Sequence, residues 1–347
     1  MGIFNNNTEK MDRITKGYFF EQLPKELHPG YESVASGILS FKNRIQVLSA
    51  KSNEDVELIL NAVLDDDALL FYIRQTKFEI QQTGSSFLLL VNYIYNKRKA
   101  LQLTNEIEEK ARSIINQYIA TDMSDYEKCL AIHDYMTEHI SYNFSALAVD
   151  SVHDAYTIEG TLLKHQAVCE GIAKAISFLL GELGIMCIIV RGRSNIDNEE
   201  DGHAWNIVKL NQRYYHLDAT WDLQEVNRFS SRSHMYVNLD DESILINHTW
   251  DLQKYPSCNS NLENYYVKEK SFFRTMRSFE LYVQKFFKSN LIYMDVRFED
   301  TLELPDDKGE MLATILQKEM IRQGKSFHIM YSFSYSNYVF QAELQPQ

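Results

Sequence analysis

Cys169 is the residue of this sequence with the clearest potential for covalent chemistry. It lies in Ala167-Val168-Cys169-Glu170-Gly171, where a loop-like stretch gives way to an apolar helical pattern. The first turn of a helix carries unpaired backbone N–H groups and the positive end of the helix dipole. Both features stabilise a thiolate, and the N–H groups would also bind the oxyanion of a tetrahedral intermediate. The position therefore favours a nucleophile, with a buried core cysteine as the alternative.

A histidine and an aspartate are spaced so that they would serve such a thiol. Asn211-Gln212 is a plausible two-residue turn between strand-like segments at 203–210 and 213–220. Because side chains alternate along a strand, this pairing puts His203 and Asp218 on one face as diagonal neighbours, about 7–8 Å apart at the backbone. The imidazole would take the thiol proton and the carboxylate would orient the ring. A one-residue slip would separate them, and a pair that only ties the hairpin together is the alternative.

Three ordered motifs contain these residues: Val168-Cys169-Glu170-Gly171, His203-Ala204-Trp205-Asn206 and Tyr215-His216-Leu217-Asp218-Ala219-Thr220-Trp221-Asp222. Their order resembles the core of the transglutaminase-like superfamily, over about residues 110–255, and the outer segments resemble those of uncharacterised bacterial members. The resemblance implies a papain-like fold with a catalytic triad. In that triad Cys169 is the nucleophile, His203 is the general base and acid, and Asp218 orients His203.

The neighbouring segments have patterns that would position the three residues. Ser124 and Glu127 have the spacing of a capping box, which predicts a helix from that point. A preceding helix is expected to begin near Thr104, and the helix that opens at Cys169 should end before Gly184. Three strand-type segments follow, at 186–190, 203–210 and 213–220.

The two ends of the chain have patterns of their own. Ser52 is expected to cap a helix, and the aromatic and β-branched runs around Thr83-Gly84-Ser85 predict a β-hairpin. The C-terminal elements are expected to be a helix, a strand, a helix and two strands, at 279–287, 291–298, 308–323, 327–333 and 338–344. The predicted fold class is α+β, with a papain-like, transglutaminase-like core of helices and antiparallel strands over 106–258. An α+β lobe over 1–105 and an α+β domain over 259–347 would flank it.

A few further residues are candidates for supporting roles. Gln166 would donate a side-chain hydrogen bond to the oxyanion, or it is a loop residue in contact with water. Trp205 and Trp221 would exclude water and form a wall for the substrate, with core packing as an equal alternative. His216 is interpreted as structural. The candidates for a surrounding shell are His234, His248 and Trp250.

No metal or cofactor is expected. A zinc site of Cys169, His203, His216 and Asp218 is disfavoured, because the two histidines lie two cross-strand pairs apart. Nothing indicates a calcium requirement, and the acidic stretch at 197–201 is expected to be a solvated loop, with a lid over the cleft as a further hypothesis.

Composition limits the partners. The 48 acidic and 35 basic residues give a formal net charge of −13, which argues against binding of nucleic acid or an anionic membrane surface. Four cysteines without a CxxC pair indicate neither a disulfide scaffold nor a structural zinc site. The N-terminus has no signal-peptide pattern and no apolar run is long enough to span a bilayer, so a cytoplasmic protein is expected. The oligomeric state does not follow from these features.

The sequence thus predicts a thiol enzyme that forms an acyl-enzyme on Cys169 from a peptide or protein amide. Water as the second nucleophile would make it a peptidase or deamidase, and a lysine amine would make it a transglutaminase-type acyltransferase. The triad fits both outcomes, and the lack of a calcium signature favours hydrolysis slightly. A non-catalytic binding or scaffold protein with a vestigial core is the alternative.

Overall fold

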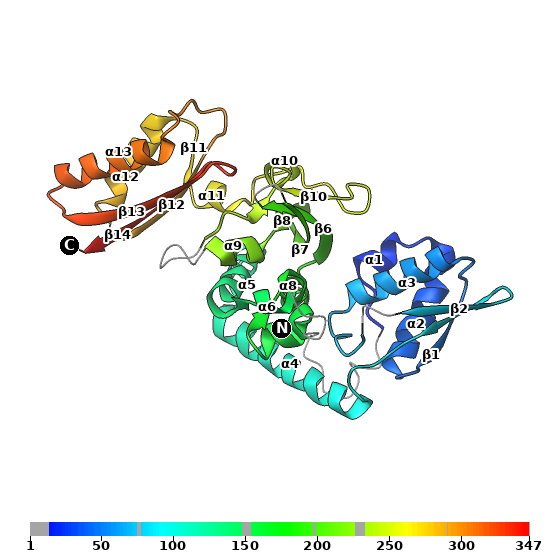
Figure 1. Cartoon of the computed structure of the whole chain (residues 1–347). Coiled ribbons are helices and arrows are strands. Elements are labelled where there is room, and N and C mark those ends of the chain that lie inside the picture. The colour runs from blue at the N-terminus through cyan, green and yellow to red at the C-terminus, as the bar shows by residue number, and fades with distance from the viewer. Residues whose placement is uncertain are drawn as a thin grey trace. The chain divides into compact units, whose positions relative to one another are not determined.

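A computed structural model describes residues 14–74, 78–147, 154–196, 199–225, 233–289 and 291–346. It divides into two compact units, of which the first holds 1–190 and 204–207 and the second holds 191–203 and 208–347. Figure 1 shows the helices and strands along the chain. The division into parts at 1–105, 106–258 and 259–347 stays a prediction.

The N-terminal part of the first unit combines short helices with a small antiparallel sheet. Its elements are α1 (Tyr18–Gln22), η2 (Lys25–Leu27), α2 (His28–Leu39), β1 (Arg44–Val47), α3 (Asn53–Asp66), β2 (Glu79–Thr83) and β3 (Ser86–Leu90), with the strands in the order β1-β3-β2. The predicted cap of α3 is confirmed, because the Ser52 side chain accepts a hydrogen bond from the Asp55 N–H. The predicted hairpin is also confirmed, since Thr83 pairs with Ser86 around Gly84, whose φ is 62°.

The rest of the first unit is mainly helical. Its elements are α4 (Lys97–Tyr118), α5 (Asp125–His139), β4 (Ser141–Tyr142), α6 (Phe144–Leu147), η3 (Asp154–Tyr156), α7 (Ile158–Leu162), β5 (Gln166–Ala167) and α8 (Cys169–Glu182). The predicted capping box is confirmed, with Ser124 and Glu127 each bonded to the other's backbone N–H. The predicted start near Thr104 is wrong, because Asn96 caps α4 by accepting from the Lys99 N–H and the helix begins earlier.

Helix α8 has the boundaries that the sequence predicts. Its first residue is Cys169, and the chain leaves the helix through Gly184, whose φ of 77° suits glycine. The N–H of Ile185 closes this end on the carbonyl of Leu180, at 2.9 Å. The buried face of α8 includes Ile172, Ala173, Ile176 and Leu179. Packing along this face fixes the direction in which the helix points its first turn.

The sheet that carries the predicted histidine has the strand order β10-β6-β7-β8-β9. Its strands are β6 (Cys187–Ile196), β7 (Glu199–Leu210), β8 (Arg213–Leu217), β9 (Val237–Leu239) and β10 (His248–Trp250), and the nearby helices are α9 (Ala219–Glu225), α10 (Asp241–Ile244) and α11 (Tyr265–Lys268). Asn211 and Gln212 have φ values of 49° and 63°, the pattern of a type I′ turn, so the predicted turn between β7 and β8 is confirmed.

Two local predictions around this hairpin are wrong. The second strand does not reach Thr220, because β8 ends at Leu217 and the Asp218 side chain caps α9 instead. The acidic stretch before His203 is not wholly a loop, because residues 199–201 belong to β7, which is hydrogen-bonded to β6 in the sheet. Asp197 and Asn198 lie outside the described residues.

The C-terminal part of the second unit is a sheet covered by two helices (Figure 1). Its elements are β11 (Phe272–Phe273), α12 (Met276–Phe286), β12 (Tyr293–Phe298), α13 (Lys308–Arg322), β13 (Phe327–Ser334) and β14 (Val339–Pro346), with the strands in the order β11-β12-β14-β13. Phe279 of α12 and Leu312 of α13 share one apolar cluster with Val296 and Phe340 of the sheet. The predicted order of helices and strands in this part is confirmed.

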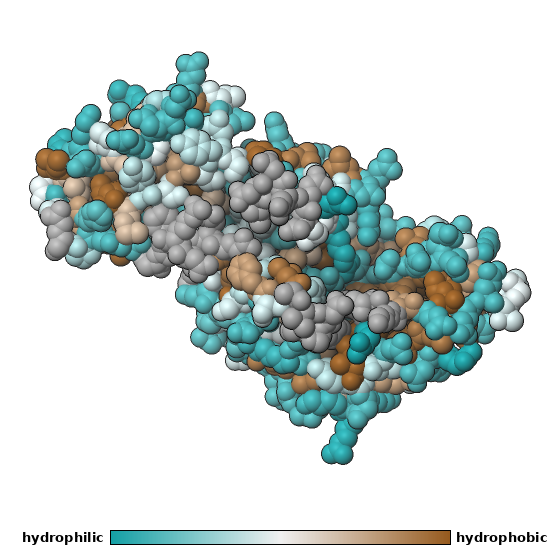
Figure 2. Space-filling model, in the orientation of Figure 1, coloured by the Kyte–Doolittle hydropathy of each residue, from teal (hydrophilic) through white to brown (hydrophobic). Residues whose placement is uncertain are grey.

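The predicted α+β class is confirmed, since helices alternate with largely antiparallel sheets, apart from the short parallel pairs β4–β5 and β11–β12. Hydrophilic side chains cover much of the face shown in Figure 2. Among the described helices, none is both long and apolar enough to cross a membrane.

Candidate active site

Cys169 opens α8, and its side chain is half-buried. It packs against a cluster of Ala173 in the next turn, Ile189 of β6 and Ala204 of β7. Asn206, two residues further along β7, is 1% exposed and donates its side-chain amide to the carbonyl of Ala173, at 3.0 Å. The strand segment after His203 is therefore tied to the first turns of the helix that Cys169 begins.

The residues after Cys169 seat this end of the helix. A side chain at Gly171 would bring its Cβ to 2.5 Å from the carbonyl oxygen of Ala155, so only glycine allows this close approach. Lys174 is 2% exposed, pairs with Glu170 at 2.7 Å, and donates to the carbonyl of Tyr156 at 3.3 Å. The Cys-Glu-Gly motif thus has a structural role beside its cysteine, because it anchors the N-terminus of α8 to η3.

His203 and Asp218 meet, as the sequence predicts. His203 Nε2 lies 2.7 Å from Asp218 Oδ2, and the two residues are 8% and 1% exposed. The other carboxylate oxygen, Oδ1, accepts hydrogen bonds from the backbone N–H groups of Thr220, at 2.9 Å, and Trp221, at 3.2 Å. Asp218 therefore stands at the helix cap after β8, where the strand's end and the helix's start both fix its side chain.

The electrostatic balance at Asp218 favours the carboxylate. Burial would raise its pKa, but the charge of His203 and the hydrogen bonds from His203 and His248 outweigh that effect, so the pKa of Asp218 lies well below its usual range. An ionised carboxylate only accepts hydrogen bonds. His203 Nε2 must therefore carry a proton, which fixes the tautomer of the neutral ring.

His248, one of the three residues expected in a surrounding shell, is a direct neighbour of Asp218. Its Nε2 lies 3.0 Å from Asp218 Oδ2, the same oxygen that contacts His203. The other two residues expected in a surrounding shell lie elsewhere, with His234 Nδ1 at 3.7 Å from Asp295 and the Trp250 ring at 4.6 Å from that of His216. The only signal in the sequence is the histidine itself, since its place depends on β10 pairing with β6.

The three weaker candidates have different settings. The Trp221 ring lies 6.3 Å from the His203 ring and 4.7 Å from the His248 ring, so it lines this histidine pair. Trp205 is only 1% exposed, which favours core packing over a wall for substrate. Gln166 is exposed on β5, beside Ser141 of β4, and its role at an oxyanion stays a prediction.

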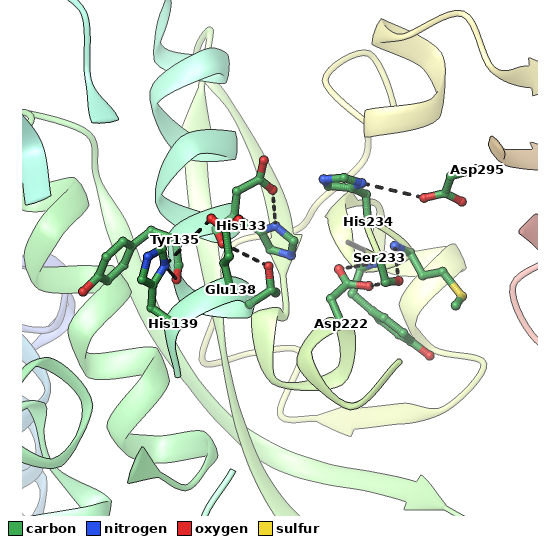
Figure 3. Close-up of polar contacts among 12 residues, drawn as sticks. His133, Tyr135, Glu138, His139, Asp222, Ser233, His234 and Asp295 are labelled. Carbon is green, nitrogen blue, oxygen red and sulfur yellow. Dashed lines mark hydrogen bonds and ion pairs between the residues drawn. The ribbon is translucent and has the colours of Figure 1, made fainter. Parts of the chain in front are cut away.

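A second set of hydrogen bonds fixes the backbone around Asp218. The Asp218 N–H donates to the carbonyl of Tyr236, at 3.1 Å. Asp222, one turn into α9, accepts from the Ser233 hydroxyl at 2.6 Å and from the Tyr236 N–H at 3.0 Å. Figure 3 shows Asp222 and Ser233 side by side, with the neighbouring His234 directed toward Asp295. Asp222, the second aspartate of the third motif, therefore fixes the segment around Tyr236 to which the Asp218 backbone is hydrogen-bonded.

His216 does not join His203 at Asp218. Its Nε2 lies 2.8 Å from Asp241 Oδ1 instead, which agrees with the structural role predicted for it. Cys258 lies beside this pair, and all three ligand atoms are within 4.8 Å of one another. Burial raises the pKa of the Cys258 thiol, and the charge of Asp241 adds to the effect. The thiol donates to the carbonyl of Pro256, at 3.8 Å.

The profile of the transglutaminase-like superfamily matches residues 112–219. The chain is similar to the kyphoscoliosis peptidase of Mus musculus, with 23% identity over 198 residues, and to that of Homo sapiens, with 24% over 178 residues. These alignments cover 52% and 46% of this chain but only 30% and 27% of the relatives, so the chain spans less than a third of their length. A solved TGase gives a TM-score of 0.30 at 16% identity, over 51% of this chain and 50% of its own.

The profile match includes Cys169, His203 and Asp218 in their expected order. The match covers less than half of the chain, so residues 112–219 are similar to the transglutaminase-like superfamily.

Proposed function

We propose that this chain is a thiol-dependent enzyme that opens a peptide or protein amide through an acyl-enzyme on Cys169. The observation that carries the proposal is the buried pair of His203 and Asp218, joined at 2.7 Å. Such a pair gives an imidazole that accepts a proton and remains stabilised once it is charged. The position of Cys169 on the first turn of α8 supplies the matching nucleophile.

The reaction follows from these groups. The thiol proton passes to Nδ1 of His203, because Nε2 donates to Asp218. The thiolate attacks the amide carbonyl, and backbone N–H groups of the α8 first turn bind the oxyanion. The C–N bond then breaks as His203 returns the proton to the departing amine, which leaves a thioester. A second nucleophile attacks the thioester and releases Cys169.

The residue that follows His203 supports the proposed pairing of His203 with Cys169. Ala204 directly follows His203 and packs in the cluster of Cys169. Asn206 adds the hydrogen bond to α8. The proposal requires the His203 imidazole to reach the Cys169 sulfur. The strand segment that follows His203 already contacts the helix that Cys169 begins.

The second nucleophile decides the reaction type. We propose water, which makes the chain a peptidase or deamidase. The transglutaminase-type reaction, with an amine in place of water, uses the same residues and differs only in which molecule reaches the thioester.

The acyl-enzyme is tested first with an activated ester, p-nitrophenyl acetate, which does not depend on knowing the substrate. We expect one acetyl group on Cys169 by peptide mass spectrometry, none in Cys169→Ala, and slower acetylation in His203→Ala. Cys187→Ala is the matched control, because it removes another partly exposed thiol and should leave acetylation of Cys169 unchanged. Acetylation spread evenly over the four cysteines would point to a vestigial core in a binding protein.

The reaction type is tested with a glutamine-rich protein, with and without a fluorescent primary amine. Ammonia or new peptide termini without amine incorporation would show hydrolysis, which is the expected result. Incorporation of the amine that disappears in Cys169→Ala would show transfer and would overturn the choice of water.

A further inference from the structure

One carboxylate oxygen of Asp218 is shared by two imidazoles. Oδ2 lies 2.7 Å from His203 Nε2 and 3.0 Å from His248 Nε2. His248 is fully buried, at 0% exposure, and its ring centroid is 5.3 Å from that of His203. The nucleophile, the base and the orienting acid of the proposed mechanism do not need this second ring, so its contact with Asp218 calls for its own explanation.

We propose that His248 is a positioning residue that holds Asp218 in the orientation needed to brace His203, by donating its Nε2 proton to Oδ2. The inference rests on the proposed function, in which Asp218 orients His203. It adds a residue to that site and assigns it a defined protonation state, a neutral ring with the proton on Nε2.

The hydrogen-bond inventory of Asp218 supports this assignment. An ionised carboxylate has no proton to donate, so each ring nitrogen that contacts it must supply one. The two backbone N–H groups of Thr220 and Trp221 hold Oδ1, while His203 and His248 hold Oδ2. Without His248, the only side-chain donor to Oδ2 among these contacts would be His203, the ring that Asp218 orients. The carboxylate would then be free to turn with the His203 ring.

Charge explains why the second ring stays neutral. Burial lowers the pKa of His248, although Asp218 opposes the effect, and the charge of His203 lowers it further. When His203 becomes an imidazolium beside a thiolate, a second cation 5.3 Å away would weaken that state. A neutral His248 donates a hydrogen bond without adding this repulsion.

The far side of the His248 ring is also held. Its Nδ1 lies 2.7 Å from Asn247 Oδ1, and Asn247 Nδ2 lies 2.7 Å from the Tyr236 hydroxyl. A ring with its proton on Nε2 alone accepts at Nδ1, so the proposed protonation state requires the flipped orientation of the Asn247 amide, with Nδ2 donating to the ring and Oδ1 accepting from the Tyr236 hydroxyl. The Trp221 ring, at 4.7 Å, packs on the imidazole. Asn247, Tyr236 and Trp221 therefore fix the direction in which His248 points its donor.

His216 supplies a matched control. It is also fully buried, also hydrogen-bonded to a carboxylate, and lies in the same unit, but its partner is Asp241. If buried His–Asp pairs matter only for stability, variants of His216 and His248 should have equal effects. If His248 acts through Asp218, its variants alone should change the behaviour of His203.

The test compares His248→Phe, His248→Gln and His216→Gln in the full chain. Phenylalanine keeps a ring but removes the donor, whereas the glutamine amide restores a donor at about the reach of Nε2. We expect His248→Phe to slow acetylation of Cys169 about ten- to a hundred-fold, and His248→Gln and His216→Gln to stay within about threefold of the unmodified chain. Thermal unfolding of each variant shows that it is folded before rates are compared.

A second readout does not use the reaction. In the Cys169→Ala background, ¹⁵N spectra of the histidine rings should show His248 neutral with Nε2 protonated, and His248→Phe should change the shifts and titration of His203. An unchanged His203 ring in His248→Phe, or a protonated His248 at neutral pH, would overturn the inference. If acetylation fails in every form while His203 still responds to His248→Phe, the proposed function fails and the positioning contact stands.

Discussion

His203–Asp218 and His216–Asp241 are two imidazole–carboxylate pairs in the same unit, with N–O distances of 2.7 and 2.8 Å. Both histidines and Asp218 are buried, whereas Asp241 is half-buried. In both pairs the pKa of the carboxyl is lowered, because hydrogen bonds to histidine outweigh burial. The second pair even has a cysteine, Cys258, within 4.8 Å. Residue type and pair geometry alone would make His216, Asp241 and Cys258 the more complete triad.

The two clusters differ in the exposure of their cysteines and in the backbone N–H groups that their carboxylates accept. Cys258 is fully buried and burial raises its pKa, whereas Cys169 is half-buried on the first turn of a fourteen-residue helix. Asp241 accepts the Cys258 N–H at 3.0 Å and so ties a loop to α10. Asp218 caps α9 and braces His203 instead. Exposure and a helix N-terminus both favour a reactive thiol, so the comparison predicts that Cys169 reacts and that Cys258 does not, although Cys258 also lies near a histidine and an aspartate.

Deleting each thiol should separate the two clusters most strongly. We expect Cys169→Ala to lower turnover about a million-fold, to the detection limit, as loss of a nucleophile does. Cys258→Ala should keep turnover within a few-fold and lower only stability, because it leaves a small cavity. Steady-state rates and thermal unfolding measure both effects. Loss of activity in Cys258→Ala with an intact fold would contradict the comparison.

Neutralising each carboxylate should have the next largest effect. Asp218→Asn should lower turnover about ten-thousand-fold, because an amide favours the wrong tautomer of the bracing histidine. Asp241→Asn removes the same charge from the other pair and should leave turnover nearly unchanged. Rates of acetylation and deacetylation locate the loss. Equal losses in both variants would indicate that these pairs support the fold alone.

Alkylation should distinguish the four thiols. Iodoacetamide at pH 6–7 should label Cys169 at least about ten-fold faster than the others, since labelling follows thiolate content and access. Burial raises the pKa of Cys129 to about 12 and also raises that of Cys187 and Cys258. Peptide mass spectrometry over time gives the four rates, and His203→Ala should slow only Cys169. Uniform labelling would argue against an activated thiol.

The smallest expected effect is on stability. Burial lowers the pKa of His216, against the opposing effect of Asp241, so the unfolded chain takes up protons first as the pH falls below about 6.5 and stability should decrease there. His216→Gln removes this group and should flatten the decrease between pH 7 and 5 by about 2–4 °C in Tm, the response to about 1 kcal/mol for a domain of 150–250 residues. Scanning calorimetry across this range measures it. An unchanged slope would mean that His216 does not titrate with unfolding.

Much of the local structure was predictable because the signals are local. The capping box at Ser124, the cap at Ser52 and the turn at Asn211-Gln212 each depend on residues a few positions apart. The error at Thr220 has the same origin, because a strand pattern ran into a residue that is also a good helix cap. Asp218 fits both the strand pattern and a helix cap, and its capping of the following helix ends the strand.

The sequence by itself determined that a cysteine would open a helix, that a histidine would lie on a strand, and that an aspartate would reach it across a tight turn. Those facts depend on backbone hydrogen bonds and side-chain alternation within short segments. Only the tertiary structure brought His248 to Asp218 and gave His216 a different carboxylate, since both depend on distant strands and loops packing together. Burial, which sets the charge states of these rings, also exists only once the whole unit has folded.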